Sequence, residues 1–276
     1  MYELKFMKTI WALSAALLLF ASCSSNPYSP TNKVYRKQAK ELAKTISKPA
    51  LPAIEGPGIK AAPYFVGTTN FNLRKPNYVI IHHTAQNACE KTLKTFTLSK
   101  TQVSAHYVIC KDGTVYNMLN DYLRAWHGGA AKWGNVTDIN SVSIGIELDN
   151  NGFEPFSDTQ IDGLIALLQL LKKNYNIPAA NFIGHADIAP QRKQDPNQYF
   201  PWKKLAQAGL GLWYDDILEL APENFDYITA LRVIGYDVRD KNAAVIAFKR
   251  HFIQTDLSPQ LTQFDKNVIF NLVKKY

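Results

Sequence analysis

Hydrophobic and polar positions between about residues 64 and 208 alternate between the period of a β-strand and that of a helix. Short apolar or β-branched runs are typical of buried strands, and they occur at residues 78–81, 106–110, 114–119, 143–148 and 182–185. The second and third runs flank Lys-Asp-Gly, which predicts a hairpin. We therefore expect an α/β fold, a mixed central β-sheet flanked by helices.

Two helices are expected between these strands. Residues 87–90 have the pattern of a capping box, so a helix should begin there and run toward Leu98. Ser157 should cap a longer helix that ends near residues 174–178. The apolar positions of that helix form a single stripe, made by Ile161, Leu164, Ile165, Leu168 and Leu171.

The end of the chain has only the helical period. Helices are expected over residues 224–234 and 242–252, the first ending at Gly235. Ser258-Pro259 has the order of an N-cap followed by proline in the first turn, which predicts a third helix. We therefore assign residues 63–208 to the α/β domain and residues 209–276 to a small three-helix domain.

The beginning of the chain has the pattern of an export signal. Residues 10–21 are almost all apolar, follow two lysines and end just before Cys23. The run is short for a membrane-spanning helix and resembles a bacterial lipoprotein signal, so residues 1–22 should be removed and Cys23 should carry lipid. An ordinary signal peptide or a membrane anchor is the alternative. Met1 and Met7 are both possible starts.

Residues 23–62 are expected to form a tether, with a helix over residues 34–46. The segment is polar, basic and broken by prolines and glycines. It holds much of the excess positive charge of the chain, which is +8 overall. A basic tether can lie against anionic lipid headgroups, and a solvated spacer is the alternative. Nucleic-acid binding is not expected, because an exported chain does not meet nucleic acid.

Two cysteines remain once Cys23 is lipidated. An oxidising periplasm permits a disulfide between Cys89 and Cys110, and two buried free thiols are the alternative. Neither their spacing nor their neighbours indicate a cysteine zinc site.

Candidate chemistry lies in VIIHHT (79–84) and GHADIAPQRKQDP (184–196). His82 and His185 each end a predicted strand, and Asp195 follows in a loop that prolines prevent from being one helix. Two neutral imidazoles and one carboxylate suit a catalytic zinc ion whose fourth position is left for water. The loop must fold back for Asp195 to reach His185.

Two charged residues near these stretches are further candidates. Lys193 lies two residues before Asp195, so both side chains point to one side of an extended segment, and Lys193 could stabilise an oxyanion. A surface lysine is the alternative. Glu147 lies in an otherwise apolar strand, where a carboxylate is costly without a partner or a function. A general base acting on a metal-bound water is the function we expect.

Five blocks together resemble one enzyme family: VIIHHTA, SAHYVI, AWHGG, IGIELDN and GHADIAPQRKQDP. Their order is similar to that of the zinc-dependent N-acetylmuramoyl-L-alanine amidases, which share a fold with phage amidase-type lysozymes and peptidoglycan recognition proteins. The resemblance implies one zinc ion (Zn2+) bound by His82, His185 and Asp195. It also implies Glu147 as catalytic base and Lys193 as oxyanion partner.

The resemblance further implies that His106, Trp126 and His127 line the substrate groove. His83 stands where the family more often has asparagine or an aromatic residue. Three roles for it remain open: contact with substrate, a local hydrogen bond, or competition as a ligand.

The reaction implied is hydrolysis of the amide between N-acetylmuramic acid, or its anhydro form, and L-alanine of the peptidoglycan stem peptide. The helical tail resembles a peptidoglycan-binding module, and the whole chain resembles the branch of outer-membrane lipoproteins that face the periplasm. We expect a monomer with peptidoglycan and muropeptides as partners. A lipoprotein that binds muropeptides without cleaving them is the alternative, and a metallopeptidase of the stem peptide is another. The commonest zincin and serine-hydrolase signatures are absent from the sequence.

Overall fold

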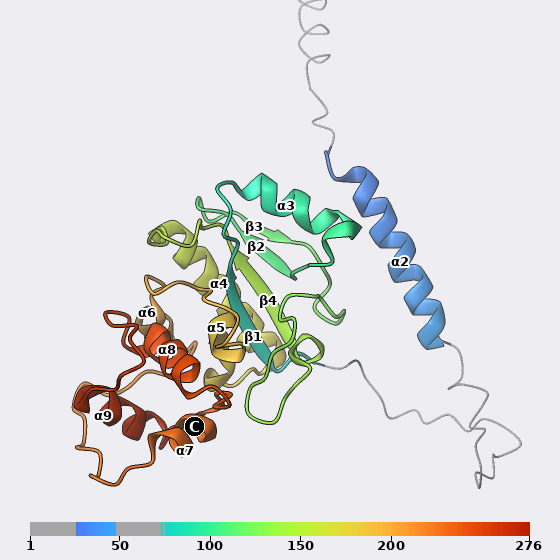
Figure 1. The fold of residues 1–276 in the computed structure, drawn as a ribbon. Coiled ribbons are helices and arrows are strands. Elements are labelled where there is room, and N and C mark those ends of the chain that lie inside the picture. The colour runs from blue at the N-terminus through green and yellow to red at the C-terminus, as the bar shows by residue number, and fades with distance from the viewer. Residues whose placement is uncertain (1–25, 48–72, 74) are drawn as a thin grey trace, which may run out of the picture. The chain divides into compact units, whose positions relative to one another are not determined.

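The computed structural model describes residues 26–47, 73 and 75–276 (Figure 1). The chain divides into two compact units, residues 1–71 and 72–276. The predicted signal peptide and Cys23 lie outside the described residues. In the first unit, helix α2 (Ser29–Ser47) has no buried residue and includes the helix expected in the tether. None of the described helices combines the length and the apolar character needed to cross a membrane.

The second unit is built on a five-stranded sheet with the order β3-β2-β4-β1-β5. β1 is parallel to both β4 and β5, β2 is parallel to β4, and β3 is antiparallel to β2. The predicted mixed sheet and its hairpin are therefore confirmed. The strands are β1 (Tyr78–His83), β2 (Tyr107–Ile109), β3 (Val115–Asn117), β4 (Ser143–Leu148) and β5 (Phe182–Gly184).

One face of the sheet packs against helix α4 (Asp158–Tyr175). Leu164 and Leu168 of the predicted apolar stripe share a buried cluster with strand residues such as Ile146. The Ser157 hydroxyl caps the helix by accepting a hydrogen bond from the backbone N–H of Gln160 at 3.2 Å, as predicted. The remaining short elements of this region are α3 (Cys89–Thr97), α6 (Trp202–Gln207) and the 3-10 turns Ser99–Thr101, Ile139–Ser141 and Ala179–Asn181.

The helical tail shares a hydrophobic core with the opposite side of the sheet. Ile80 of β1 and Ile183 of β5 belong to the same buried cluster as Leu231 and Phe248 of the tail. The sheet and the tail therefore share one hydrophobic core, and the division at residue 209 stays a prediction. The tail helices are α7 (Tyr227–Ile234), α8 (Lys241–Phe252) and α9 (Gln263–Leu272).

A buried carboxylate links the tail to the short helix α5 (His185–Ile188). Asp187 of α5 accepts hydrogen bonds from the Tyr236 hydroxyl and from Nδ1 of His251, both at 2.8 Å. It also accepts one from the backbone N–H of Gly184 at 2.7 Å. The His251 ring stacks on Trp202, with ring centroids 3.8 Å apart. The tail therefore holds the helix on which His185 lies.

Three local predictions are wrong. Helix α3 begins after Ala88 without any side-chain cap, so residues 87–90 are not a capping box. The third tail helix begins after Thr262 and not at the N-cap expected at Ser258, and the Thr262 hydroxyl accepts from the backbone N–H of Asp265 in a capping box. The strand expected over residues 182–185 ends at Gly184, and His185 opens α5 instead.

Cys89 and Cys110 form a disulfide, with their Cα atoms 5.4 Å apart. It links the first residue of α3 to the residue after β2. Of the two alternatives that the sequence left open, the structure contains the disulfide.

Candidate active site

The three predicted metal ligands meet at the carboxyl ends of β1 and β5. His82 is the penultimate residue of β1, His185 follows β5 directly, and Asp195 returns from the next loop. Nδ1 of His82 lies 2.9 Å from Nδ1 of His185 and 3.1 Å from Oδ2 of Asp195. Nδ1 of His185 lies 3.0 Å from the same oxygen. All three side chains are buried, and their ligand atoms form one triangle.

Backbone hydrogen bonds fold the Asp195 loop back to this position. The Asp195 carbonyl accepts from the backbone N–H of Ala186 at 2.7 Å. Two residues later, the backbone N–H of Asn197 donates to Nδ1 of His83 at 3.2 Å. His83 therefore makes a local hydrogen bond, one of the three roles left open for it, and ties this loop to β1.

The triangle has the chemistry of a cation site. A neutral imidazole has a single N–H, and His185 uses it at Nε2 toward the carbonyl of Gly128, 3.1 Å away. The Nδ1 atom of His185 then has a lone pair that faces the triangle. Neighbouring ligands of a tetrahedral zinc ion at 2.0–2.1 Å stand about 3.3 Å apart, close to the separations found here. The three residues could therefore hold one divalent metal ion.

The protonation states of His82 and Asp195 also suit the binding of a metal ion. Burial and then the charge of the neighbouring His185 lower the pKa of His82 to about 4, so His82 is neutral at physiological pH. Burial acts to raise the pKa of Asp195, but hydrogen bonds from His185 and His82 hold it well below its usual range. Metal binding requires neutral imidazole and ionised carboxylate, and these are the forms that His82 and Asp195 take.

Glu147 lies beside the triangle. It is paired with His82 in the β1–β4 register, and its Oε2 atom is buried without a hydrogen-bond partner among the described residues. Burial, and then the charge of Asp195, raise the pKa of Glu147 to about 8. A bound cation would favour the ionised carboxylate and compensate this cost. The unpartnered oxygen is thus a second observation that fits a metal ion in the triangle.

Lys193 is half-buried in the loop that bears Asp195. Its backbone N–H donates to the carbonyl of Ala189 at 2.9 Å, and its side chain ends in an ammonium group. That positive charge acts to lower the pKa values of both His82 and Glu147. Lys193 is therefore close enough to act electrostatically on the groups around the triangle.

The predicted groove residues do not share one environment. Trp126 is 49% exposed, so its predicted contact with substrate remains a prediction. His106 is fully buried, donates from Nε2 to the Leu123 carbonyl at 2.9 Å and accepts at Nδ1 from the Gly145 N–H at 3.0 Å. His127 is buried behind His82, with its Nδ1 atom 3.1 Å from Nε2 of that ligand. These positions favour supporting roles for both histidines.

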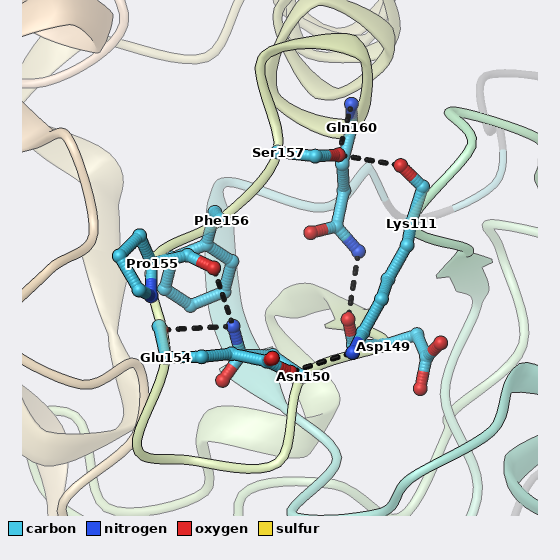
Figure 2. Close-up of a pocket in the computed structure, with 8 residues that line it drawn as sticks. All are labelled: Lys111, Asp149, Asn150, Glu154, Pro155, Phe156, Ser157 and Gln160. Carbon is cyan, nitrogen blue, oxygen red and sulfur yellow. Dashed lines mark hydrogen bonds and ion pairs between the residues drawn. The ribbon is translucent and has the colours of Figure 1, made fainter.

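A cavity of about 320 Å³ lies at the junction of β4 and α4 (Figure 2). None of the predicted site residues lines this cavity. Its walls are formed by Lys111, Asp149, Asn150, Glu154, Pro155, Phe156, Ser157 and Gln160.

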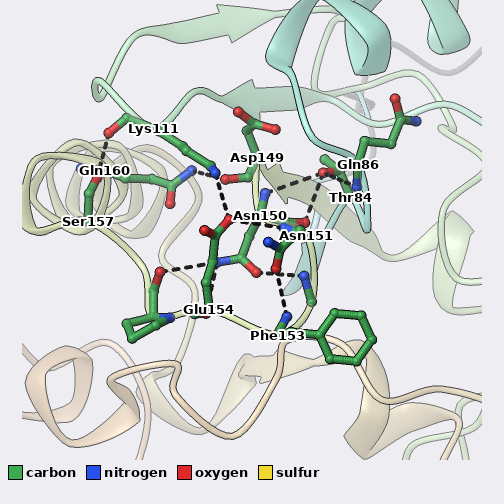
Figure 3. Close-up of polar contacts among 12 residues, drawn as sticks. Thr84, Gln86, Lys111, Asp149, Asn150, Asn151, Phe153, Glu154, Ser157 and Gln160 are labelled. Atoms are coloured by element: carbon green, nitrogen blue, oxygen red, sulfur yellow. Dashed lines mark hydrogen bonds and ion pairs between the residues drawn. The ribbon is translucent and has the colours of Figure 1, made fainter.

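Asn150, on the wall of this cavity, connects the loops around the site (Figure 3). The Thr84 hydroxyl, just after β1, donates to the Asn150 carbonyl at 3.3 Å. The Asn150 amide donates to the Glu154 carbonyl at 3.1 Å, and the Asn197 amide donates to Oδ1 of Asn150 at 3.2 Å. This network joins the segments that follow β1, β4 and Asp195. The sequence does not predict this network, because isolated asparagines in loops give no signal of their partners.

Comparisons with known proteins agree with this arrangement. The sequence model of the family described as N-acetylmuramoyl-L-alanine amidase matches residues 72–198. The chain is 34% identical over 230 residues to N-acetylmuramoyl-L-alanine amidase AmiD of Escherichia coli. The aligned region covers 72% of this chain and 82% of AmiD. It is 38% identical over 104 residues to 1,6-anhydro-N-acetylmuramyl-L-alanine amidase AmpD of Haemophilus influenzae. That aligned region covers 37% of this chain and 56% of AmpD.

Solved structures show the same likeness over most of the chain. Escherichia coli AmiD in complex with anhydro-N-acetylmuramic acid-L-Ala-D-gamma-Glu-L-Lys has a TM-score of 0.67 at 29% identity, over 81% of this chain and 97% of that one. AmpDh3 of Pseudomonas aeruginosa has a TM-score of 0.68 at 26% identity, over 79% and 99% respectively. With its mixed sheet, its buried His-His-Asp triangle and these relatives, the chain belongs to the N-acetylmuramoyl-L-alanine amidase family.

Proposed function

We propose that this amidase depends on zinc and cleaves the bond between N-acetylmuramic acid, or its anhydro form, and L-alanine of the stem peptide. The observation that carries the proposal is the triangle of ligand atoms from His82, His185 and Asp195, all within 3.1 Å of one another. The substrate is supported by AmiD of Escherichia coli, whose complex contains an anhydro-muropeptide.

Each residue around the triangle has a chemical role in this proposal. Zinc bound there would supply Lewis acidity toward the scissile carbonyl and lower the pKa of a water at its open position. Glu147 accepts a proton from the attacking water and returns it to the departing amine of L-alanine. The Lys193 ammonium stabilises the negative charge that develops on the carbonyl oxygen. Trp126, exposed beside the buried His127, contributes to the wall of the substrate groove.

Mass spectrometry of the products from defined muropeptides tests the reaction. Incubation with anhydro and reducing muropeptides should release a peptide that begins with L-alanine and leave the sugar intact. A chelator should stop the release, and added zinc should restore it. Cleavage inside the stem peptide would make the protein a metallopeptidase, and binding without cleavage would make it a muropeptide-binding protein. Release that is insensitive to chelator would remove zinc from the proposal.

We also propose that the protein is an outer-membrane lipoprotein facing the periplasm. The support is the sequence pattern alone, with an apolar run that ends before Cys23. Metabolic labelling with palmitate should mark the protein, and the label should disappear in Cys23→Ala together with the membrane association. An unlabelled protein in the soluble periplasmic fraction would contradict the anchor and leave the amidase proposal intact.

A further inference from the structure

We propose that His127 and Ser143 form a hydrogen-bond relay that fixes the tautomer of His82 and turns its Nδ1 lone pair toward the metal. His127 is then a positioning residue and lies behind the metal ligand, outside the substrate groove. The relay ends on the backbone carbonyl of Ile139. The inference deepens the proposed zinc site and therefore rests on the proposed function.

The direction of the relay follows from the number of hydrogens at its far end. The Ser143 hydroxyl donates its single hydrogen to the Ile139 carbonyl, 2.6 Å away. Nε2 of His127 lies 3.2 Å from the same hydroxyl oxygen. With its hydrogen already used, the hydroxyl can only accept from His127. The proton of the neutral His127 ring is therefore on Nε2.

The same assignment of hydrogens can be carried from His127 to the metal ligand His82. Because Nε2 of His127 has the proton, its Nδ1 atom has a lone pair and accepts from Nε2 of His82, 3.1 Å away. The proton of neutral His82 is therefore also on Nε2. Its Nδ1 atom is left as a lone pair at the corner of the triangle, 3.1 Å from Oδ2 of Asp195. A metal ligand held by an outer hydrogen bond in this way keeps one tautomer and one ring orientation.

The packing leaves the relay little freedom. His82, His127 and Ser143 are each at most 9% exposed, so water has little access to the hydrogen bonds that join them. Gly145, on the strand beneath, makes room for the ring. A Cβ atom at this position would lie 2.4 Å from Cγ of His127.

Gly128, the residue after His127, supports the second imidazole ligand, His185. The carbonyl of Gly128 accepts from Nε2 of His185 at 3.1 Å and from Nη2 of Arg192 at 2.9 Å. Oδ1 of Asn140 accepts from the backbone N–H groups of His127 and Gly128, at 3.2 and 2.8 Å. Residues 127–128 are thus fixed by the fold and contact both imidazole ligands from the side away from the triangle.

Zinc affinity tests the relay directly. We expect His127→Phe, which fills the space but accepts no hydrogen bond, to weaken zinc binding by about 10- to 100-fold in competition with a chromogenic chelator. His127→Gln, which offers an amide oxygen to His82 and an amide N–H to Ser143, should restore most of that affinity. Ser143→Ala should give a smaller loss. The control is Tyr175→Phe, which removes the hydrogen bond of another aromatic side chain, to Asp121 and outside the relay, and should leave zinc affinity unchanged.

The possible outcomes separate the relay from the zinc site itself. Unaltered protein that binds no zinc would overturn the proposed function, whereas equal affinity of unaltered protein and His127→Phe would overturn the relay alone. If His127→Phe does not fold, nitrogen NMR of the unaltered zinc-loaded protein decides. Protons on Nε2 of both His82 and His127 support the relay, and a proton on Nδ1 of His127 contradicts it.

Discussion

Replacing Glu147 with glutamine is expected to lower kcat by roughly 10²- to 10⁴-fold, the usual contribution of a general acid–base group. Glutamine has nearly the same shape but cannot take a proton from water or return one to the departing amine. Glu147 is outside the His-His-Asp triangle, so zinc content and KM should stay close to those of the unaltered protein. The measurements are steady-state kinetics on a defined muropeptide and metal analysis of the same sample.

The strand that bears Glu147 also provides a matched control. Asp149 lies two residues further along the chain, just beyond β4, and burial raises the pKa of its carboxyl group too. Asp149→Asn neutralises a second buried acid without touching the triangle, and it should turn over substrate at nearly the normal rate. Comparable losses in both variants would point to a general effect of charge or stability. A largely active Glu147→Gln would remove Glu147 as the base.

The metal triangle could be predicted because its parts depend on regular structure. His82 lies at the carboxyl end of a strand with an unmistakable apolar run, and His185 follows a second one. Both strands are parallel and adjacent, so the fold brings their ends to the same edge. The position of Asp195 does not follow from regular structure, because it depends on backbone hydrogen bonds of an irregular loop. Residue spacing does not encode those bonds.

The depth of a side chain could not be read from the sequence. His82 and His83 are consecutive, yet the first joins the triangle and the second bonds the backbone of Asn197. His127 and Trp126 are also consecutive, and only the tryptophan is exposed to solvent. Alternation along an extended segment predicts that neighbours point in opposite directions. It does not predict which direction leads to substrate.

Packing between distant segments was likewise invisible in the sequence. Helical periodicity located the three tail helices and their apolar positions, but it did not name the surface they cover. In the structure, Tyr236 and His251 of the tail reach the carboxylate of Asp187, two residues after a predicted ligand. The tail, for which the sequence predicts peptidoglycan binding, is therefore also part of the framework that holds His185.

Replacing His185 with alanine should remove zinc and activity together. The change deletes one of three ligand atoms and leaves Nδ1 of His82 and Oδ2 of Asp195, only two donors for an ion that normally has three protein ligands in a catalytic site. The affinity should fall by more than the roughly 10- to 100-fold that is typical of outer hydrogen-bond partners. Turnover should drop to the level of chelator-treated enzyme.

The fold should survive this change, because the Gly128 carbonyl, which loses its hydrogen bond from His185, has a second donor. The Gly128 carbonyl keeps its hydrogen bond from Arg192 at 2.9 Å when the imidazole is removed. Metal content measured beside Glu147→Gln then separates the two roles: the glutamine variant keeps zinc without turnover, and the alanine variant loses both. A metal-replete and fully active His185→Ala would refute the ligand assignment, and with it the triangle as the site of catalysis.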